Sequence, residues 1–140
     1  MSNDRTSFPR RLSGGRYRRR AERSGRRIHG YGAFNARRGA KNFTDEEFVK
    51  AVRYCHVRGC KVYVTLNTLV NDREMRDAVA AAKLASDAGA DALIVQDLGM
   101  SYAIRCALPD IPLHASTQMS LHNLAGVEAA AEMGITRAVL

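Results

Sequence analysis

The fold of the chain is decided by the stretch Asp91-Ala-Leu-Ile-Val-Gln-Asp-Leu-Gly99, in which a short apolar run ends abruptly in polar side chains. A continuous Ala-Leu-Ile-Val run is typical of a strand buried on both faces, as in parallel sheets flanked by helices. The stretch Pro112-Leu-His-Ala-Ser-Thr-Gln-Met-Ser120 repeats the pattern with a shorter run. Because ligand sites of α/β proteins lie at the carboxyl ends of parallel strands, we expect the chemistry of the chain at these two boundaries.

Helices alternate with strands on both sides of these stretches. Apolar residues at helical spacing, closed by a glycine in three cases, predict helices at residues 44–58, 71–88, 101–108 and 123–133. Strands are expected at residues 61–67, 91–97, 112–115 and 136–140. This alternation predicts an α/β fold with a parallel sheet, which we interpret as part of a TIM-barrel-like (β/α) barrel. An open doubly wound sheet is the alternative.

The positive charge of the chain is confined to its beginning. The chain has 140 residues and a formal net charge of +8. Residues 1–41 hold 13 Lys/Arg against Asp4 and Glu22, whereas residues 42–140 hold 9 Lys/Arg against 12 Asp/Glu. We therefore divide the chain into a disordered, arginine-rich segment at residues 1–29 and an incomplete barrel domain at residues 30–140. An arginine-rich segment of this kind can bind the phosphates of RNA.

The composition argues against membrane and secreted classes. No apolar run approaches the ~20 residues that span a bilayer, and the N-terminus lacks the apolar core, ~7–15 residues long, of a secretory signal. The three cysteines, Cys55, Cys60 and Cys106, are an odd number without a closely spaced pair. Such cysteines are typical of reduced thiols, so we expect a cytoplasmic protein without a membrane span.

The polar residues at the strand ends form the candidate site. We expect them to converge on a substrate-binding pocket, because buried amides and carboxylates need partners that a substrate can supply. They are Asn67, Gln96, Asp97, His114, Ser116, Thr117 and Gln118. The alternative is structural: Gln96 and Asp97 would cap the following helix, and Ser116-Thr117 would close a loop.

The sequence identifies neither a catalytic residue nor a metal site. His114 and Ser116 are two residues apart on a strand, where side chains point the same way without aligning as nucleophile and base. No acid is evident to orient the histidine. The spacing of the histidines does not match a zinc site.

Four stretches of the chain resemble the U32 peptidase family, the collagenase-like proteases. They are Asn42-Phe-Thr44, Lys61-Val-Tyr-Val-Thr-Leu-Asn-Thr68 and the two strand-end stretches at residues 91–99 and 113–120. The resemblance extends over residues 30–140 and implies a (β/α) barrel-like N-terminal half. That family was named for protease activity, and other members support hydroxylation of a base in tRNA or ribosomal RNA, or of a quinone ring.

The resemblance also carries expectations about cofactors and partners. Those hydroxylation members hold an iron–sulfur cluster on cysteines later in the chain, and none of the three cysteines here matches those positions. We therefore expect no cofactor within these 140 residues, with the cluster ligands of full-length relatives lying beyond Leu140. RNA or a peptide is the expected substrate, and the chain alone is expected to be inactive.

The arginine-rich segment departs from the family pattern. The family begins with a strand, a helix and a second strand of the type Gly-Ala-Asp-Ala-Val-Tyr-Leu-Gly. Arginine codons of the type CGN become alanine codons when read one base later. With suitable codons, residues 18–30 then read Ala-Ala-Val-Gln-Asn-Gly-Ala-Asp-Ala-Val-Tyr-Met-Gly. We interpret residues 1–29 as out of frame, and a real cationic tail is the alternative.

Two further functions remain as alternatives. One is a generic barrel lyase or synthase with Lys61 or Lys83 as a Schiff-base lysine. Lys61 opens its strand at the amino end and Lys83 lies on a helix, so neither is placed for that chemistry. The other is an RNA-binding module that uses residues 1–29.

The chain is expected to fold poorly by itself. A closed barrel has no open strand edge, whereas a sheet lacking strands before residue 61 and after residue 140 has two. Because domains are stable by only ~5–15 kcal/mol, losing the burial of several strands should exceed that margin. We expect no sharp thermal transition by circular dichroism and calorimetry. A cooperative transition from a monomer would contradict this expectation.

Overall fold

The structure, a computed structural model, describes the backbone of residues 26–30 and all of residues 44–139. In this part of the chain five strands form one sheet, and every pair of neighbours is parallel. The strands lie in the order in which they follow one another along the sequence. They are β1 (Arg26–Gly30), β2 (Lys61–Leu66), β3 (Ala92–Val95), β4 (Leu113–Ala115) and β5 (Ile135–Ala138).

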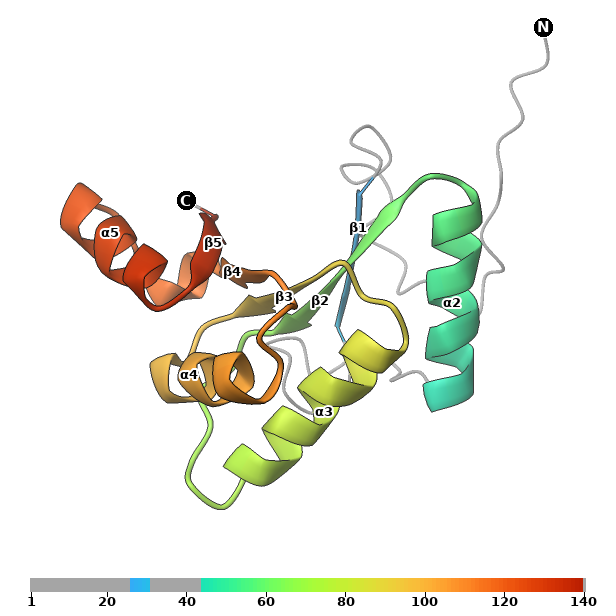
Figure 1. Cartoon of the computed structure of the whole chain (residues 1–140), viewed down its shortest axis with the longest axis horizontal. Helices are drawn as coiled ribbons and strands as arrows, with labels where there is room; N and C mark the ends of the chain where they lie inside the picture. Colours follow the sequence, from blue (N-terminus) through green and yellow to red (C-terminus); the bar gives the residue numbers. More distant parts are fainter. Residues whose placement is uncertain (1–25, 31–43, 140) are drawn as a thin grey trace, which may run out of the picture.

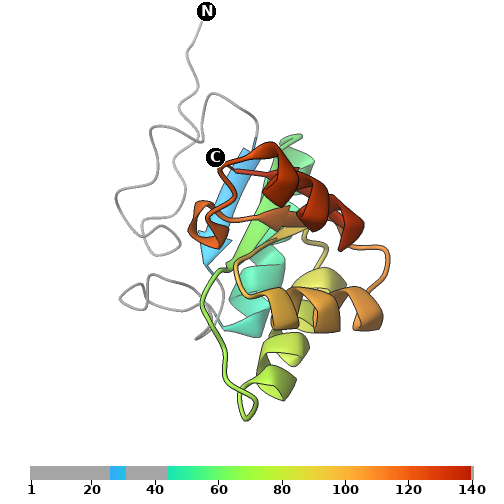
Figure 2. The same cartoon turned by 90° about the vertical axis from the view of Figure 1, so that its left-hand side faces the viewer.

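The helices decide between the two architectures expected from the sequence. They are α2 (Asp45–Val57), α3 (Met75–Asp87), α4 (Leu98–Ala107) and α5 (Leu124–Glu132), with a short 3-10 turn, η2 (Thr117–Met119). Figures 1 and 2 show α2, α3 and α4 covering the same face of the sheet. A doubly wound sheet reverses its strand order and carries helices on both faces. The described strands instead follow the sequence order, which is compatible with part of a (β/α) barrel, and the predicted α/β fold with a parallel sheet is confirmed.

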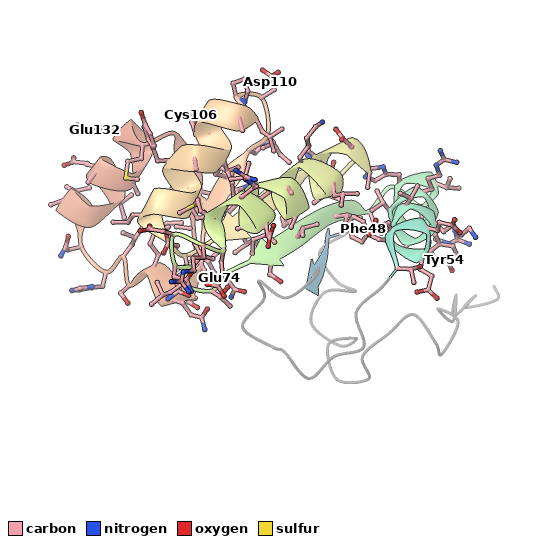
Figure 3. All side chains as sticks on the ribbon, turned by 90° about the horizontal axis from the view of Figure 1, so that it is seen from below. Phe48, Tyr54, Glu74, Cys106, Asp110 and Glu132 are labelled. Carbon is pink, nitrogen blue, oxygen red and sulfur yellow. The ribbon has the colours of Figure 1, made fainter. Side chains whose placement is uncertain are left out.

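The apolar side chains of the strands are divided between two faces of the sheet. Val62, Val64 and Leu66 of β2 belong to the main core beneath the helices, together with Phe48 of α2. Figure 3 shows Phe48 on the side of α2 that faces α3. Tyr63 alternates with these residues and forms a smaller cluster with Ala92 and Ile94 of β3. Because successive side chains of a strand point to opposite faces, this smaller cluster lies on the face that a barrel turns inward.

The predicted elements are found, with shifts at the starts of two helices. The N-terminal cap of α2 is as expected: Thr44 Oγ1 accepts from Glu47 N at 3.3 Å, and Glu47 Oε2 accepts from Thr44 N at 3.0 Å. The helix expected from residue 71 begins at Met75 instead. Asn71 Oδ1 accepts from Arg73 N and Glu74 N, which closes a turn before the helix. The helix expected from residue 101 begins at Leu98.

Strand β1 corrects the boundary of the arginine-rich segment. It lies mostly within residues 1–29, which were expected to be disordered, and pairs in parallel with residues 61–65 of β2. A strand therefore precedes residue 61, and the edge of β2 that was expected to be open is paired. Residues 1–25 and 31–43 lie outside the described residues, so the remaining expectations about the N-terminal segment stay predictions.

One arginine links two loops at the amino ends of the last two strands. Arg105 of α4 donates from Nη1 to the carbonyl oxygens of Pro109 at 2.6 Å and Ile111 at 3.1 Å, and from Nη2 to Gly134 O at 2.8 Å. Gly134 has a φ of +82°, and a Cβ there would approach Arg105 Nε to 2.9 Å. The guanidinium thus fixes the loop before β4 against the turn before β5.

We expect Arg105→Met to lower the free energy of unfolding by about 2 kcal/mol. Three backbone carbonyls lose a charged donor, and hydrogen bonds to charged groups contribute about 1.5–3 kcal/mol each when buried and less when partly exposed. Urea denaturation followed by circular dichroism measures the change. Arg76→Met, at an exposed position of α3, is the control and should change stability little. Equal losses in the two variants would show that the loops do not depend on Arg105.

Candidate functional site

The carboxyl ends of three neighbouring strands meet at one level of the sheet. Leu66 of β2 pairs with Val95 of β3, and Val95 pairs with Ala115 of β4. The residue that follows each of these strand ends is polar: Asn67, Gln96 and Ser116. The parallel register therefore brings the sequence-predicted site residues to one edge, where α/β proteins hold their ligands.

Three of the seven predicted residues are in direct contact. Asn67 Nδ2 donates to Gln118 Oε1 at 2.9 Å and to Ser116 Oγ at 3.4 Å. The backbone N–H of Gln118 also donates to Ser116 Oγ, at 3.3 Å. Because Oε1 of Gln118 is the acceptor in this cluster, its amide nitrogen turns away and keeps two N–H donors for another partner.

Asp97 has the structural role that was the alternative reading of the sequence. Its Oδ1 accepts from Met100 N at 2.8 Å, which caps α4, and its Oδ2 accepts from Val70 N at 3.4 Å in the loop after β2. Gln96 does not share this role, since no hydrogen bond joins its side chain to another described residue. Its half-buried amide therefore remains available to a ligand.

His114 and Ser116 do not form a catalytic pair. His114 is only 6% exposed and packs edge-on against Tyr63, with ring centroids 4.9 Å apart and an interplanar angle of 85°. The hydroxyl oxygen of Ser116 accepts from Asn67 and from the backbone of Gln118, and so caps η2. Thr117, the remaining predicted residue, is exposed in η2.

A cleft of about 560 Å³ has three of the seven predicted residues in its lining. It lies between the start of α4 and α5, and Gln96, Asp97 and Gln118 provide its polar side chains. The rest of its wall is formed by apolar or small residues of the loops and of α5. They are Leu69, Leu98, Gly99, Met119, Leu121, Gly126, Ala129, Ala130 and Met133.

The sequence interpretation missed this apolar wall, although a signal was present. Two of the predicted polar strand ends are followed by a leucine at the same spacing, in Asn67-Thr-Leu69 and Gln96-Asp-Leu98. These leucines are 69% and 57% exposed, which is unusual for a large apolar side chain next to a buried strand. A repeated exposed leucine at a strand end points to a cleft that receives an apolar surface.

The cysteines and lysines do not add a second site. Cys55 is buried on the inner face of α2, Cys60 is half-buried before β2, and Cys106 is exposed on α4. They do not form the thiolate set that an iron–sulfur cluster needs, and no cluster of three or more His, Cys, Asp or Glu that could hold a metal occurs among the described residues. Lys61 opens β2 at its amino end, and Lys83 on α3 pairs with Asp87 at 3.0 Å. Within the described residues, no helix has the length and hydropathy of a membrane span.

Comparisons with known proteins show what the chain is similar to. The model of peptidase family U32 matches residues 28–140. A 23S rRNA 5-hydroxycytidine synthase of Escherichia coli is 36% identical over 107 residues, which is 76% of this chain and 16% of that protein. A tRNA hydroxylation protein of Bacillus subtilis is 34% identical over 107 residues, 76% of this chain and 25% of that protein.

A protease is also among the similar proteins. A collagenase of Porphyromonas gingivalis is 34% identical over 90 residues, which is 61% of this chain and 20% of that protein. The chain thus spans between about a sixth and a quarter of the length of these three curated relatives.

Substitution of two adjacent residues should separate the structural role from the ligand role. Asp97→Ala is expected to lower the free energy of unfolding by about 1 kcal/mol, because α4 loses its cap. Gln96→Ala should change it by less than about 0.5 kcal/mol, because the amide makes no contact that the fold needs. Urea denaturation of both variants is the measurement. If Gln96→Ala lowered the free energy of unfolding as much as Asp97→Ala does, Gln96 would also have a structural role.

Proposed function

Because the chain belongs to peptidase family U32, we propose that it supplies the barrel part of a protein that takes part in hydroxylating a base in RNA. The observation that carries this proposal is the cleft at the carboxyl edge, which combines apolar walls with two amides. Relatives named for hydroxylation of ribosomal RNA and of tRNA match three quarters of this chain. Because hydroxylation of ribosomal RNA and tRNA would take place in the cytoplasm, the proposal includes a cytoplasmic location.

The cleft suits a nucleobase that has left its stack. A base has two flat apolar faces and a polar edge, and enzymes that modify bases take them into pockets that read this edge. Leu69, Leu98 and Met119 provide apolar surface for the faces. The amides of Gln96 and Gln118 offer donors and acceptors to the edge, and Asn67 fixes the orientation of Gln118 through Oε1. The role that we assign to these residues is to bind and orient the base, with no redox step among them.

A peptidase function has less support, although a collagenase is among the relatives. A serine nucleophile must give its proton to a base within hydrogen-bond reach. Ser116 Oγ instead accepts from two donors, Asn67 Nδ2 and Gln118 N. His114 packs on Tyr63 at the face of the sheet away from the helices. Ser116 thus caps η2 and contacts the amide of Asn67, and it is not arranged as an activated nucleophile.

The test is a segment exchange in the related rRNA synthase of Escherichia coli. Residues 28–140 replace the matching segment, and hydroxylated nucleosides are measured by mass spectrometry in a strain that lacks the native protein. We expect Gln118→Ala and Gln96→Ala each to reduce the product at least about tenfold, because a lost hydrogen bond to the base costs about 1.4 kcal/mol.

Glu128→Gln, at an exposed position of α5, is the matched control and should leave the product unchanged. Immunoblots must show equal amounts of the proteins, so that a fall in product reports binding rather than loss of protein. Full hydroxylation with both glutamine variants would show that the cleft does not bind the base that is hydroxylated.

A further inference from the structure

Four exposed cations follow one another along α2, the turn after it and the start of β2, within residues 42–140, which otherwise carry an excess of acids. They are Lys50 and Arg53 on α2, Arg58 in the turn that follows, and Lys61 at the start of β2. All four are exposed, and residues 50–61 contain no Asp or Glu. The side-chain ion pairs of the described residues, Lys83–Asp87 and His56–Asp91, involve none of them. We call these four residues the α2 basic surface.

One member of the α2 basic surface is held in place. The guanidinium of Arg58 lies 3.5 Å from the centre of the Tyr54 ring, and its Nη1 donates to Tyr54 O at 3.2 Å. Tyr54 is half-buried and packs against the edge of the main core, so the ring on which Arg58 stacks is itself held in place. A stacked arginine presents its remaining N–H donors with little loss of freedom on binding, which suits a planar array of phosphate oxygens.

The neighbouring acids do not neutralise this surface. Asp45, Glu46 and Glu47 occupy the first turn of α2, one turn before Lys50, but none of them forms an ion pair with Lys50, and Glu47 is engaged in the N-terminal cap. Asp91, from the loop before β3, pairs with His56 at 2.9 Å and accepts from Val62 N at 2.7 Å. The positive charge of the α2 basic surface is therefore left facing solvent.

The spacing of the cations fits a chain of phosphates. From Lys50 to Arg58 the helix and its turn advance by eight residues, or about 12 Å at 1.5 Å per residue. One strand of a nucleic acid carries a charge about every 3.4 Å of helix axis, so this length corresponds to about four successive phosphates. Cations in a row beside an aromatic ring are typical of surfaces that bind nucleic-acid backbones.

We propose that the α2 basic surface binds the phosphate backbone of the RNA whose base enters the carboxyl-edge cleft. This proposal rests on the proposed function and adds a second contact to it. Figure 1 shows α2 at one end of the row of helices and α5, which lines the cleft, at the other. The bound RNA therefore extends across the helices, with backbone contacts well away from the base that is modified.

The experiment compares two charge-matched double variants of the full chain. Lys50→Glu/Arg53→Glu alters the α2 basic surface, and Arg76→Glu/Lys83→Glu makes the same change in net charge on α3. Affinity for an unmodified tRNA transcript is measured by fluorescence anisotropy between 50 and 200 mM salt. Because both proteins keep the 13 Lys/Arg of residues 1–41, any attraction by that segment is the same in each.

We expect the α2 double variant to bind at least about tenfold more weakly near 100 mM salt, and its salt slope to fall by about 1.4 to 1.8, for two lost phosphate contacts. The α3 variant should lose clearly less. Equal losses in the two variants, or no loss in either, would overturn the proposal. So would stronger dependence on these residues for binding phosphatidylserine vesicles than for binding the tRNA. The milder pair Lys50→Gln/Arg53→Gln, checked by circular dichroism, excludes unfolding as the cause.

Gln118→Ala separates this proposal from the function on which it rests. It should leave the salt slope of tRNA binding nearly unchanged, unlike the α2 variants, because the base contributes little to the electrostatic part of binding. If the α2 variants bind tRNA normally while Gln118→Ala abolishes hydroxylation, the proposed role of the α2 basic surface is wrong and the proposed role of the cleft is supported. If the α2 variants weaken tRNA binding while Gln118→Ala has no effect on hydroxylation, RNA binding by the α2 basic surface is supported and the proposed role of the cleft is wrong.

Discussion

The parallel register of β2, β3 and β4 is the constraint on which the candidate site depends. It sets Leu66, Val95 and Ala115 at one level, so that the polar residue after each strand emerges at the same edge. A slip of one residue would turn the apolar side chains of a strand to the opposite face and move its polar end away from the others. The register is secured by burial, because Val62, Val64 and Leu66 are wholly buried beneath the helices.

At that edge the fold and the site use neighbouring residues for different purposes. Both carboxylate oxygens of Asp97 accept hydrogen bonds from backbone N–H groups, one in α4 and one in the loop after β2. This holds two walls of the cleft in place, and leaves the adjacent Gln96 free of the helix. Ser116 likewise caps η2 and thereby sets Gln118 toward Asn67. The amides that we propose as ligand groups are thus positioned by Asp97 and Ser116, whose own hydrogen bonds are to the protein.

Local sequence patterns predicted what depends on periodicity and on caps. The buried run before Gln96 predicted a parallel strand, and Thr44 with Glu47 predicted the start of α2, because each signal lies within a few residues. The start of α3 was misplaced, since Asn71 resembles a cap but closes a separate turn before the helix. Strand β1 was missed because its arginines carry no apolar pattern, and its pairing with β2 is a tertiary contact. The cleft joins separate loops with α5, and the Arg105–Gly134 link joins residues 29 apart in sequence, so neither periodicity nor a cap pattern predicts them. The leucines that follow two of the polar strand ends are the local signal for the apolar wall of the cleft.

The distribution of charge connects the two proposed contacts. Residues 42–140 carry more acids than bases, so most of this surface repels a polyanion and few parts of it can bind one. The four cations of the α2 basic surface are an exception, and the cleft has amides and apolar walls with a carboxylate already bound to backbone donors. Within residues 42–140 an acidic background makes such a patch selective, because the acidic parts of this surface repel RNA. In the proposed arrangement the phosphates bind at α2, and the amides and apolar walls of the cleft receive the uncharged base.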